Sequence, residues 1–268
     1  MPGVPSEMKA MWNESVRPLL MMRQNCTLHS VTLRVLGGES NLEYQVRDLL
    51  ENANPTAAIY CKTGECEIRI TARAENDSSA EKMCRAYAKK FYDLLGDAVY
   101  DEDVAGLEET VVHTLRSNGL TIATAESCTG GELAKRFTDI PGASEFFLGG
   151  VTTYTNEAKA KLLGIDPKLI EEKTAVSYEV AKQMAERVRA LLGADMGIGV
   201  TGLAGPDGDG VHEVGTVFVS LATKDGTYVR ELHVGDRRTR SYVRRVSGNY
   251  IFDMMRRYLQ GLEVIKEN

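Results

Sequence analysis

Residues 120 to 131 read L-T-I-A-T-A-E-S-C-T-G-G, a stretch in which an apolar run gives way to polar residues and two glycines. Its apolar beginning, Leu120 to Ala125, predicts a buried strand, and the residues Glu132 to Phe137 that follow it predict a helix. A hydroxyl and two glycines at a helix start leave backbone N–H groups free for a phosphate, a carboxylate or an oxyanion. The simpler alternative is that the hydroxyl only caps the helix and the glycines only allow tight packing.

The pattern around this stretch alternates between helix and strand. Helices are expected at 104–118, 130–137, 156–163, 178–192 and 239–261, and strands at 120–125, 145–154, 196–200, 216–223 and 228–233. Strands separated by helices predict a mostly parallel sheet, whereas the turn Lys224-Asp225-Gly226 joins an antiparallel pair. Ser177 is the expected N-cap of the helix that follows it. The expected fold class is therefore α/β, with three α/β/α layers.

Three polar loops follow strands of this sheet, at residues 126–131, 154–159 and 201–210. Ligands of such sheets bind beyond the carboxyl ends of the strands, so we expect the three loops to form one site. The segment Asp207-Gly208-Asp209-Gly210 lacks the ligand spacing and the final glutamate of an EF-hand. We interpret it as a flexible turn or a lid, and we expect no metal.

The first half of the chain predicts a smaller α+β domain. The domains are expected at 1–101 and 102–268. Helices are expected at 6–20, 41–51 and 79–95, and strands at 27–36, 57–61 and 66–72, with a hairpin turn at Lys62-Thr63-Gly64-Glu65. The acidic segment 100–103 is expected to be a hinge or the first turn of the next helix. This half contains no cluster of nucleophile, base and glycine loop.

The composition is that of a soluble globular protein, with 268 residues, 43% hydrophobic and 26% charged. The net charge of -6 argues against broad nucleic-acid binding. No apolar run approaches the roughly 18 residues of a membrane helix, and the N-terminus lacks a signal-peptide pattern, so we expect a cytoplasmic protein without a membrane partner. The five cysteines, without C-x-x-C spacing, predict free thiols and no zinc site.

A serine nucleophile at the junction needs a general base. None of the histidines stands in a distinctive motif: His29, His113, His212 and His233. Lysine is the alternative, because a buried amine with a lowered pKa can accept a serine proton. Lys159 follows the strand 145–154, but spacing alone does not separate it from Lys161. Cys128 has no histidine nearby in sequence to form a thiolate pair, so we interpret it as a packing residue.

Four motifs together resemble the C-terminal domain of the CinA family, the nicotinamide-nucleotide amidohydrolase or NMN deamidase domain. They are A-E-S-C-T-G-G at 125–131, T-Y-T-N-E-A-K at 153–159, A-V-S at 175–177 and G-V-T-G-L-A-G-P-D-G at 199–208. The first domain resembles the middle region of this family, since P-G-V-P-S-E-M at 2–8 is similar to the segment after its molybdopterin-binding-like domain. That upstream domain is missing from the sequence, so we expect a truncated or a natural short form.

The resemblance implies a hydrolase of pyridine-nucleotide salvage, and hence of NAD metabolism. It converts nicotinamide mononucleotide (NMN) to nicotinic acid mononucleotide and ammonia without metal or cofactor. By motif position, the resemblance implies a catalytic dyad of Ser127 and Lys159, supported by the hydroxyls of Tyr154 and Thr201. Candidates to hold the oxyanion or the 5′-phosphate are the backbone N–H groups around Thr129, Gly130, Gly131, Gly202 and Gly205.

Arginines of the last helix would neutralise the phosphate. Arg240 and Arg244 fit the family spacing better than Arg237 does, and a solvated helix face is the alternative for each. Glu126 is expected to contact the substrate, or to pair with Lys159 or one of these arginines, rather than to act as a catalytic acid.

Two other classes of function stay open. A non-catalytic binding or assembly module fits the family's naming from competence and DNA damage. ADP-ribose pyrophosphatase activity is linked to the missing upstream domain and is disfavoured. We also expect a homo-oligomer in which the α+β domain mediates the contacts between subunits.

Overall fold

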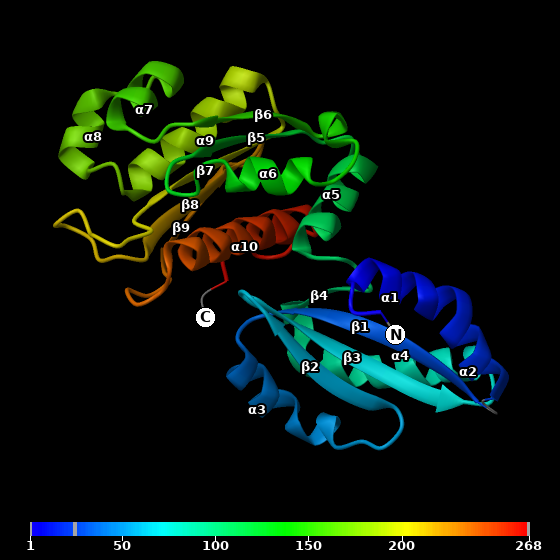
Figure 1. Cartoon of the computed structure of the whole chain (residues 1–268). Helices are drawn as coiled ribbons and strands as arrows, with labels where there is room; N and C mark the ends of the chain where they lie inside the picture. The colour runs from blue at the N-terminus through cyan, green and yellow to red at the C-terminus, as the bar shows by residue number, and fades with distance from the viewer. Residues whose placement is uncertain (1, 24–25, 267–268) are drawn as a thin grey trace. The chain divides into compact units, whose positions relative to one another are not determined.

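The computed structural model describes residues 2–23 and 26–266, and the chain forms two compact units, Met1–Asp103 and Val104–Asn268 (Figure 1). The boundary expected from the sequence was residue 101. Each unit has its own sheet, and each is described by itself.

The first unit is a four-stranded antiparallel sheet of order β2-β3-β1-β4 with helices. Its elements are α1 (Pro5–Met11), a π-helical turn (Trp12–Val16), α2 (Arg17–Arg23), β1 (Thr27–Leu36), α3 (Glu39–Leu50), β2 (Thr56–Lys62), β3 (Glu65–Ala74), α4 (Asp77–Leu95) and β4 (Val99–Glu102). Alternate residues of β1 and β3, among them Val31 and Ile70, are fully buried against Cys84 and Phe91 of α4. Burial of this apolar face is the main stabilising term of the unit.

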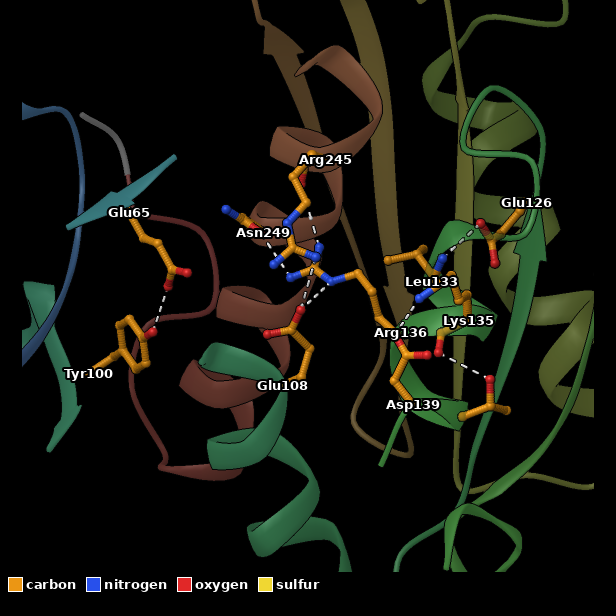
Figure 2. A network of polar contacts seen from close by, with 11 residues as sticks. Glu65, Tyr100, Glu108, Glu126, Leu133, Lys135, Arg136, Asp139, Arg245 and Asn249 are labelled. Atoms are coloured by element: carbon orange, nitrogen blue, oxygen red, sulfur yellow. Dashed lines mark hydrogen bonds and ion pairs between the residues drawn. The ribbon is translucent and has the colours of Figure 1, made fainter. Parts of the chain in front are cut away.

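The prediction of a hinge or a helix start at residues 100–103 is wrong, because most of this segment is strand β4. It pairs antiparallel with β1 at the edge of the sheet. Val99 and Tyr100 are buried, and the Tyr100 hydroxyl donates to Glu65 Oε2 over 2.6 Å (Figure 2). Strand pairing and burial here outweigh the low β propensity of the two acidic residues.

The second unit is a five-stranded sheet of order β6-β5-β7-β8-β9. Its elements are α5 (Leu107–Asn118), β5 (Ile122–Glu126), α6 (Glu132–Thr138), a 3-10 turn (Ala143–Glu145), β6 (Phe147–Thr152), α7 (Asn156–Leu163), α8 (Pro167–Lys173), α9 (Tyr178–Leu192), β7 (Met196–Gly202), β8 (Thr216–Ala222), β9 (Thr227–His233) and α10 (Arg240–Leu259). Strands β6, β5 and β7 are parallel, whereas β8 pairs antiparallel with both β7 and β9. The expected α/β class and the antiparallel last pair are confirmed, and the sheet is mixed, with two parallel and two antiparallel strand pairings.

Helices cover both faces of this sheet (Figure 1). Helix α9, with α7 and α8 beside it, packs on one face, and α6 and α10, with α5 against them, cover the other. Helix α9 comes close to β7 because Gly197 and Gly199 lack side chains: an added Cβ would lie 2.2 and 2.5 Å from carbonyl oxygens of α9. On the opposite face, the Phe137 ring packs 4.8 Å from that of Phe252, between α6 and α10. The sheet is therefore the middle layer of three.

The helix caps explain several boundaries. The Ser177 hydroxyl accepts the Val180 N–H at the start of α9, as expected from the sequence. Helix α8 was not predicted, although Asp166 caps it and Pro167 occupies its first position. None of the helices in the described residues combines the length and the apolar character that a bilayer crossing requires.

Candidate active site

The three polar loops of the second unit lie at one edge of its sheet. Because β5, β6 and β7 are parallel, their carboxyl ends point the same way and bring together the segments that follow Glu126, Thr152 and Gly202. The backbone joins the first two of these segments: the Thr153 N–H donates to the Glu126 carbonyl over 2.8 Å. The Ser127 N–H donates to the Val200 carbonyl of β7 over 2.9 Å.

A buried lysine contacts the serine at the tip of β5. Lys159 Nζ lies 3.1 Å from Ser127 Oγ and donates to the Thr153 carbonyl over 2.9 Å. Only 1% of Lys159 is exposed, and burial lowers its pKa. Within the described residues no carboxylate forms an ion pair with this amine. A desolvated amine without a counter-charge favours its neutral form, which is the form that accepts a proton.

Helix geometry separates Lys159 from Lys161. Lys159 and Leu163 stand four residues apart in α7 and share its buried face, whereas Lys161 is exposed. The Thr155 side chain caps the helix by accepting the Ala158 N–H, which fixes where that face begins. The carbonyl of Thr153, which orients the amine, was not anticipated, because a backbone acceptor has no sequence signal.

Glu126 does not take the expected place. Its carboxylate is 1% exposed and accepts three backbone N–H groups at the start of α6: Gly131 at 3.0 Å, Leu133 at 3.1 Å and Ala134 at 2.9 Å (Figure 2 shows the Leu133 bond). No ion pair joins it to Lys159 or to an arginine in the described part of the chain. Glu126 is therefore the anchor of α6, and its charge complements the positive end of that helix.

The loop at residues 126–131, called the nucleophile loop because it carries Ser127, has few backbone N–H groups without an acceptor. Gly130 donates to the Ser127 carbonyl at 3.1 Å, and Gly131 donates to Glu126, so neither N–H is available to an oxyanion, contrary to the prediction. Gly131 precedes α6 with φ of 94°, a conformation that favours glycine. In the described residues, the N–H groups of Cys128 and Thr129 donate to no other residue. These two N–H groups stand directly after Ser127.

Arg240 joins two of the loops. It lies at the first position of α10, where Thr239 is the N-cap, and its guanidinium donates to the Gly205 carbonyl and to the Tyr154 hydroxyl, the latter over 2.8 Å. Tyr154 is 58% exposed, and no hydrogen bond joins it to Lys159 in the described structure. The Tyr154 hydroxyl therefore does not orient the lysine amine in the described structure.

Arg244 is already engaged by the protein. It donates from Nε and Nη2 to the Thr129 carbonyl, over 3.0 and 2.6 Å, and lies 3.6 Å from a Glu132 oxygen. The structure thus places Arg244 behind the nucleophile loop as a support, rather than free for a substrate. Arg237 is exposed in the turn before α10.

Thr201 and Gly202 are placed by strand packing. Thr201 is 1% exposed and its hydroxyl donates to the Ala175 carbonyl over 2.7 Å, so its proton is not free for an oxyanion. A Cβ at Gly202 would lie 2.7 Å from the Thr216 carbonyl, so this glycine allows close strand pairing. In the A-V-S motif at 175–177, the Ala175 carbonyl therefore accepts a hydrogen bond from the Thr201 hydroxyl, and Ser177 caps the start of α9.

Cys128, His212 and His233 are the other candidates for a nucleophile or a base. Burial raises the pKa of Cys128 to about 12, so its thiolate form is scarce at neutral pH. His212 pairs with Asp209 at 3.2 Å within the loop after β7, and His233 lies 3.4 Å from Glu231. Of the candidate bases in the described residues, Lys159 is the one whose contact with Ser127 the structure shows.

A buried ion-pair network supports the site from behind (Figure 2). Arg136 of α6 donates to Glu108 of α5 and to Asn249 of α10, and Arg245 of α10 lies 3.1 Å from Glu108. The Arg136 guanidinium also stacks 4.4 Å above the Phe252 ring. The network joins α6, which follows the nucleophile loop, to α10, which carries Arg240 and Arg244. No sequence pattern indicated it.

Together these groups place the Ser127 hydroxyl beside a buried amine, with the N–H groups of Cys128 and Thr129 next to it in the chain and the exposed Arg240 joining the neighbouring loops. This arrangement is suited to attack on a carbonyl carbon.

Comparisons with known proteins identify relatives for both units. The family model described as CinA C-terminal domain matches residues 104–259, and the one described as Damage-inducible protein CinA KH domain matches residues 30–100. The CinA-like protein of Desulfovibrio desulfuricans is 43% identical over 268 residues, which is 98% of this chain and 63% of the relative. The CinA-like protein of Kosmotoga olearia is 41% identical, over 97% of this chain and 63% of the relative. The chain thus spans a little under two thirds of the length of these relatives.

Solved structures match over more than half of the chain. The competence damage-inducible protein A (ComA) of Klebsiella pneumoniae superposes with a TM-score of 0.56 at 28% identity, over 59% of this chain and 97% of that one. The competence/damage inducible protein CihA of Agrobacterium tumefaciens gives a TM-score of 0.51 at 32% identity, over 58% of this chain and 90% of that one.

Proposed function

We propose that this chain, which belongs to the CinA family, is an amidohydrolase that converts NMN to nicotinic acid mononucleotide and ammonia with Ser127 and Lys159 as its catalytic dyad. The observation that carries the proposal is the 3.1 Å contact between Lys159 Nζ and Ser127 Oγ in a buried environment. The choice of NMN rests on the resemblance of the four motifs, because the names of the relatives describe competence and damage rather than a reaction.

In the first half of the reaction, Ser127 Oγ attacks the carboxamide carbon while neutral Lys159 accepts the hydroxyl proton. The Thr153 carbonyl keeps the amine in place by accepting one of its N–H groups at 2.9 Å. The tetrahedral intermediate carries its negative charge on the former carbonyl oxygen. The free N–H groups of Cys128 and Thr129 are the donors that we assign to this oxyanion.

Collapse of the intermediate breaks the C–N bond. Lys159 returns the proton to the leaving nitrogen, ammonia departs, and Ser127 holds the acid as an ester. A water molecule then attacks the ester carbon, Lys159 accepts its proton and returns it to Ser127 Oγ, and the carboxylic acid leaves. One amide and one water give one acid and one ammonia, so the atoms balance.

The 5′-phosphate is assigned to the rim at Arg240. The N-terminus of α6 is already neutralised by Glu126, so an anion gains little there. Arg240 lies between the Gly205 loop and the exposed Tyr154, where a charged group remains accessible. The substrate would therefore lie with its carboxamide at Ser127 and its phosphate toward α10.

Purified protein with NMN and a chelator tests the proposal. We expect nicotinic acid mononucleotide and an equal amount of ammonia, and we expect Ser127→Ala to bind NMN by calorimetry without turning it over. Binding of NMN by a folded wild type that releases no ammonia would support the binding-module alternative instead. Metal-dependent cleavage of ADP-ribose without deamidation would support the pyrophosphatase alternative.

A further inference from the structure

Two cysteines of the first unit face each other across the β2–β3 hairpin. Cys61 of β2 and Cys66 of β3 are directly paired in the antiparallel register, and their Sγ atoms lie 3.3 Å apart. The intervening turn is closed by the Lys62–Glu65 pair, and Gly64 adopts φ of 79° in it. All five cysteines are free thiols in the structure.

The geometry is close to that of a disulfide. Residues directly opposite in an antiparallel pair have Cβ atoms about 4.5–5.5 Å apart, which approaches the spacing that an S–S bond requires. A covalent bond of about 2.05 Å needs the two sulfurs to approach by roughly 1.2 Å from their present distance. Strand β2 lies at the edge of the sheet, so this adjustment displaces no further strand on its outer side.

The two thiols differ in access. Cys61 is exposed, whereas Cys66 is buried and its thiol approaches the Gly37 carbonyl at 3.7 Å. Burial raises the pKa of Cys66 to about 12 and also raises that of Cys61, which remains the sulfur open to solvent. A reagent in solution therefore meets Cys61 first, and Cys66 stands behind it as the resolving thiol.

We propose that Cys61 and Cys66 form a reversible dithiol–disulfide site that is oxidised by exchange with a low-molecular-weight disulfide such as oxidised glutathione. The Cys61 thiolate attacks one sulfur of the reagent and releases its first thiol. The Cys66 sulfur then attacks Cys61 Sγ and displaces the second thiol. The two protein thiols lose two protons and two electrons, and the reagent disulfide gains both to become two thiols.

The disulfide would fasten the edge strand β2 to β3 beside the turn. This inference is independent of the proposed hydrolysis, because neither Ser127 nor Lys159 belongs to the first unit. It also differs from a structural disulfide, since the reduced strands are already paired along their whole length.

The sequence provides a direct assay. Trypsin cleaves after Lys62, which separates a peptide of residues 48–62 with Cys61 from a peptide of residues 63–69 with Cys66. The full chain is reduced, freed of reductant and incubated with oxidised glutathione. It is then denatured in the presence of N-ethylmaleimide, which labels free thiols, and digested with trypsin. We expect the two peptides to remain joined, with N-ethylmaleimide on three of the five cysteines. Reduction with dithiothreitol before the labelling step should give N-ethylmaleimide on all five cysteines and leave the two peptides separate.

Single variants distinguish the roles of the two sulfurs. Cys66→Ser should keep glutathione on Cys61, because the resolving thiol is missing, and Cys61→Ser should form no linked peptide. Cys26→Ser is the matched control and should form the same linked peptide as the wild type. The proposal is overturned if the wild type retains glutathione on Cys61, keeps all five labels, or joins Cys61 to Cys26 instead.

Discussion

Glu126 and Ser127 are neighbours in sequence, yet their side chains act on opposite faces of the sheet. Glu126 accepts three N–H groups of the α6 start, whereas Ser127 contacts Lys159 of α7 in the other helical layer. This division follows from the alternation of side chains along β5, in which Ala123 and Ala125 contact the α9 layer as Ser127 does. One strand end thus anchors helix α6 through Glu126 and presents the Ser127 hydroxyl to Lys159 of α7.

Glu126→Gln and Glu126→Ala should therefore weaken both fold and catalysis. Removal of the carboxylate leaves buried N–H groups without a full acceptor, which costs about 1–3 kcal/mol of unfolding free energy. Displacement of the nucleophile loop should lower kcat on the order of 10- to 100-fold. Urea denaturation and NMN turnover measure the two effects, with the exposed Glu157→Gln as control. Full activity in Glu126→Ala would contradict the anchoring role.

The pH dependence of kcat/KM should report Lys159. Burial lowers the pKa of its amine, so the neutral form that accepts the serine proton appears below the pH at which a free lysine would lose its proton. Activity should therefore rise with pH through an apparent pKa below 10.5. Lys159→Arg, which stays protonated, should be inactive at every pH. A flat wild-type profile from pH 5.5 to 10 would contradict the role of this base.

Arg240→Lys should affect substrate binding more than the chemical step. The guanidinium spans Gly205 and Tyr154 with two nitrogens, which an ammonium does not reproduce. Loss of a hydrogen bond to a charged group, about 1.5–3 kcal/mol, corresponds to a KM for NMN that rises roughly 10- to 100-fold. Steady-state kinetics should show a smaller change in kcat and no change in Arg237→Lys. An unchanged KM for NMN would contradict the assignment of the 5′-phosphate to Arg240.

Gly248→Ala should destabilise the second unit. An added Cβ would lie 2.3 Å from Arg136 Nη1, so the buried Arg136–Glu108–Asn249 network must shift. Overpacking of this kind costs about 1–3 kcal/mol. Urea denaturation should show the loss, and Ser241→Ala on the exposed side of α10 should not. Equal stability of Gly248→Ala and the wild type would show that the network adapts freely.

Much of the fold could be predicted because its signals are local. Alternation and capping placed β1, α7 and α9 at the residue bounds that the structure has, and the polar loops after β5, β6 and β7 indicated the site. Strand β4 was missed because its stability comes from pairing with β1, which a local pattern of acidic residues does not reveal. Helix α8 was missed although Asp166 and Pro167 carried a usable signal.

The site was harder to predict because it depends on which partner each polar group meets. Ser127 and Lys159 stand 32 residues apart, and only the packed face of α7 distinguishes Lys159 from Lys161. Glu126 and Arg244 carry charges suited to a substrate, but backbone groups of the protein already occupy them. The sequence motifs indicated which residues lie at the site, but not which groups each of them contacts.

The catalytic roles of Ser127 and Lys159 are tested by ammonia release from NMN with a chelator present. The release is measured side by side for the wild type, Ser127→Ala, Lys159→Ala and Lys161→Ala. We expect turnover in the wild type and in Lys161→Ala, and its loss in the other two folded variants. Turnover that persists without the Ser127 hydroxyl or without the Lys159 amine would contradict these roles.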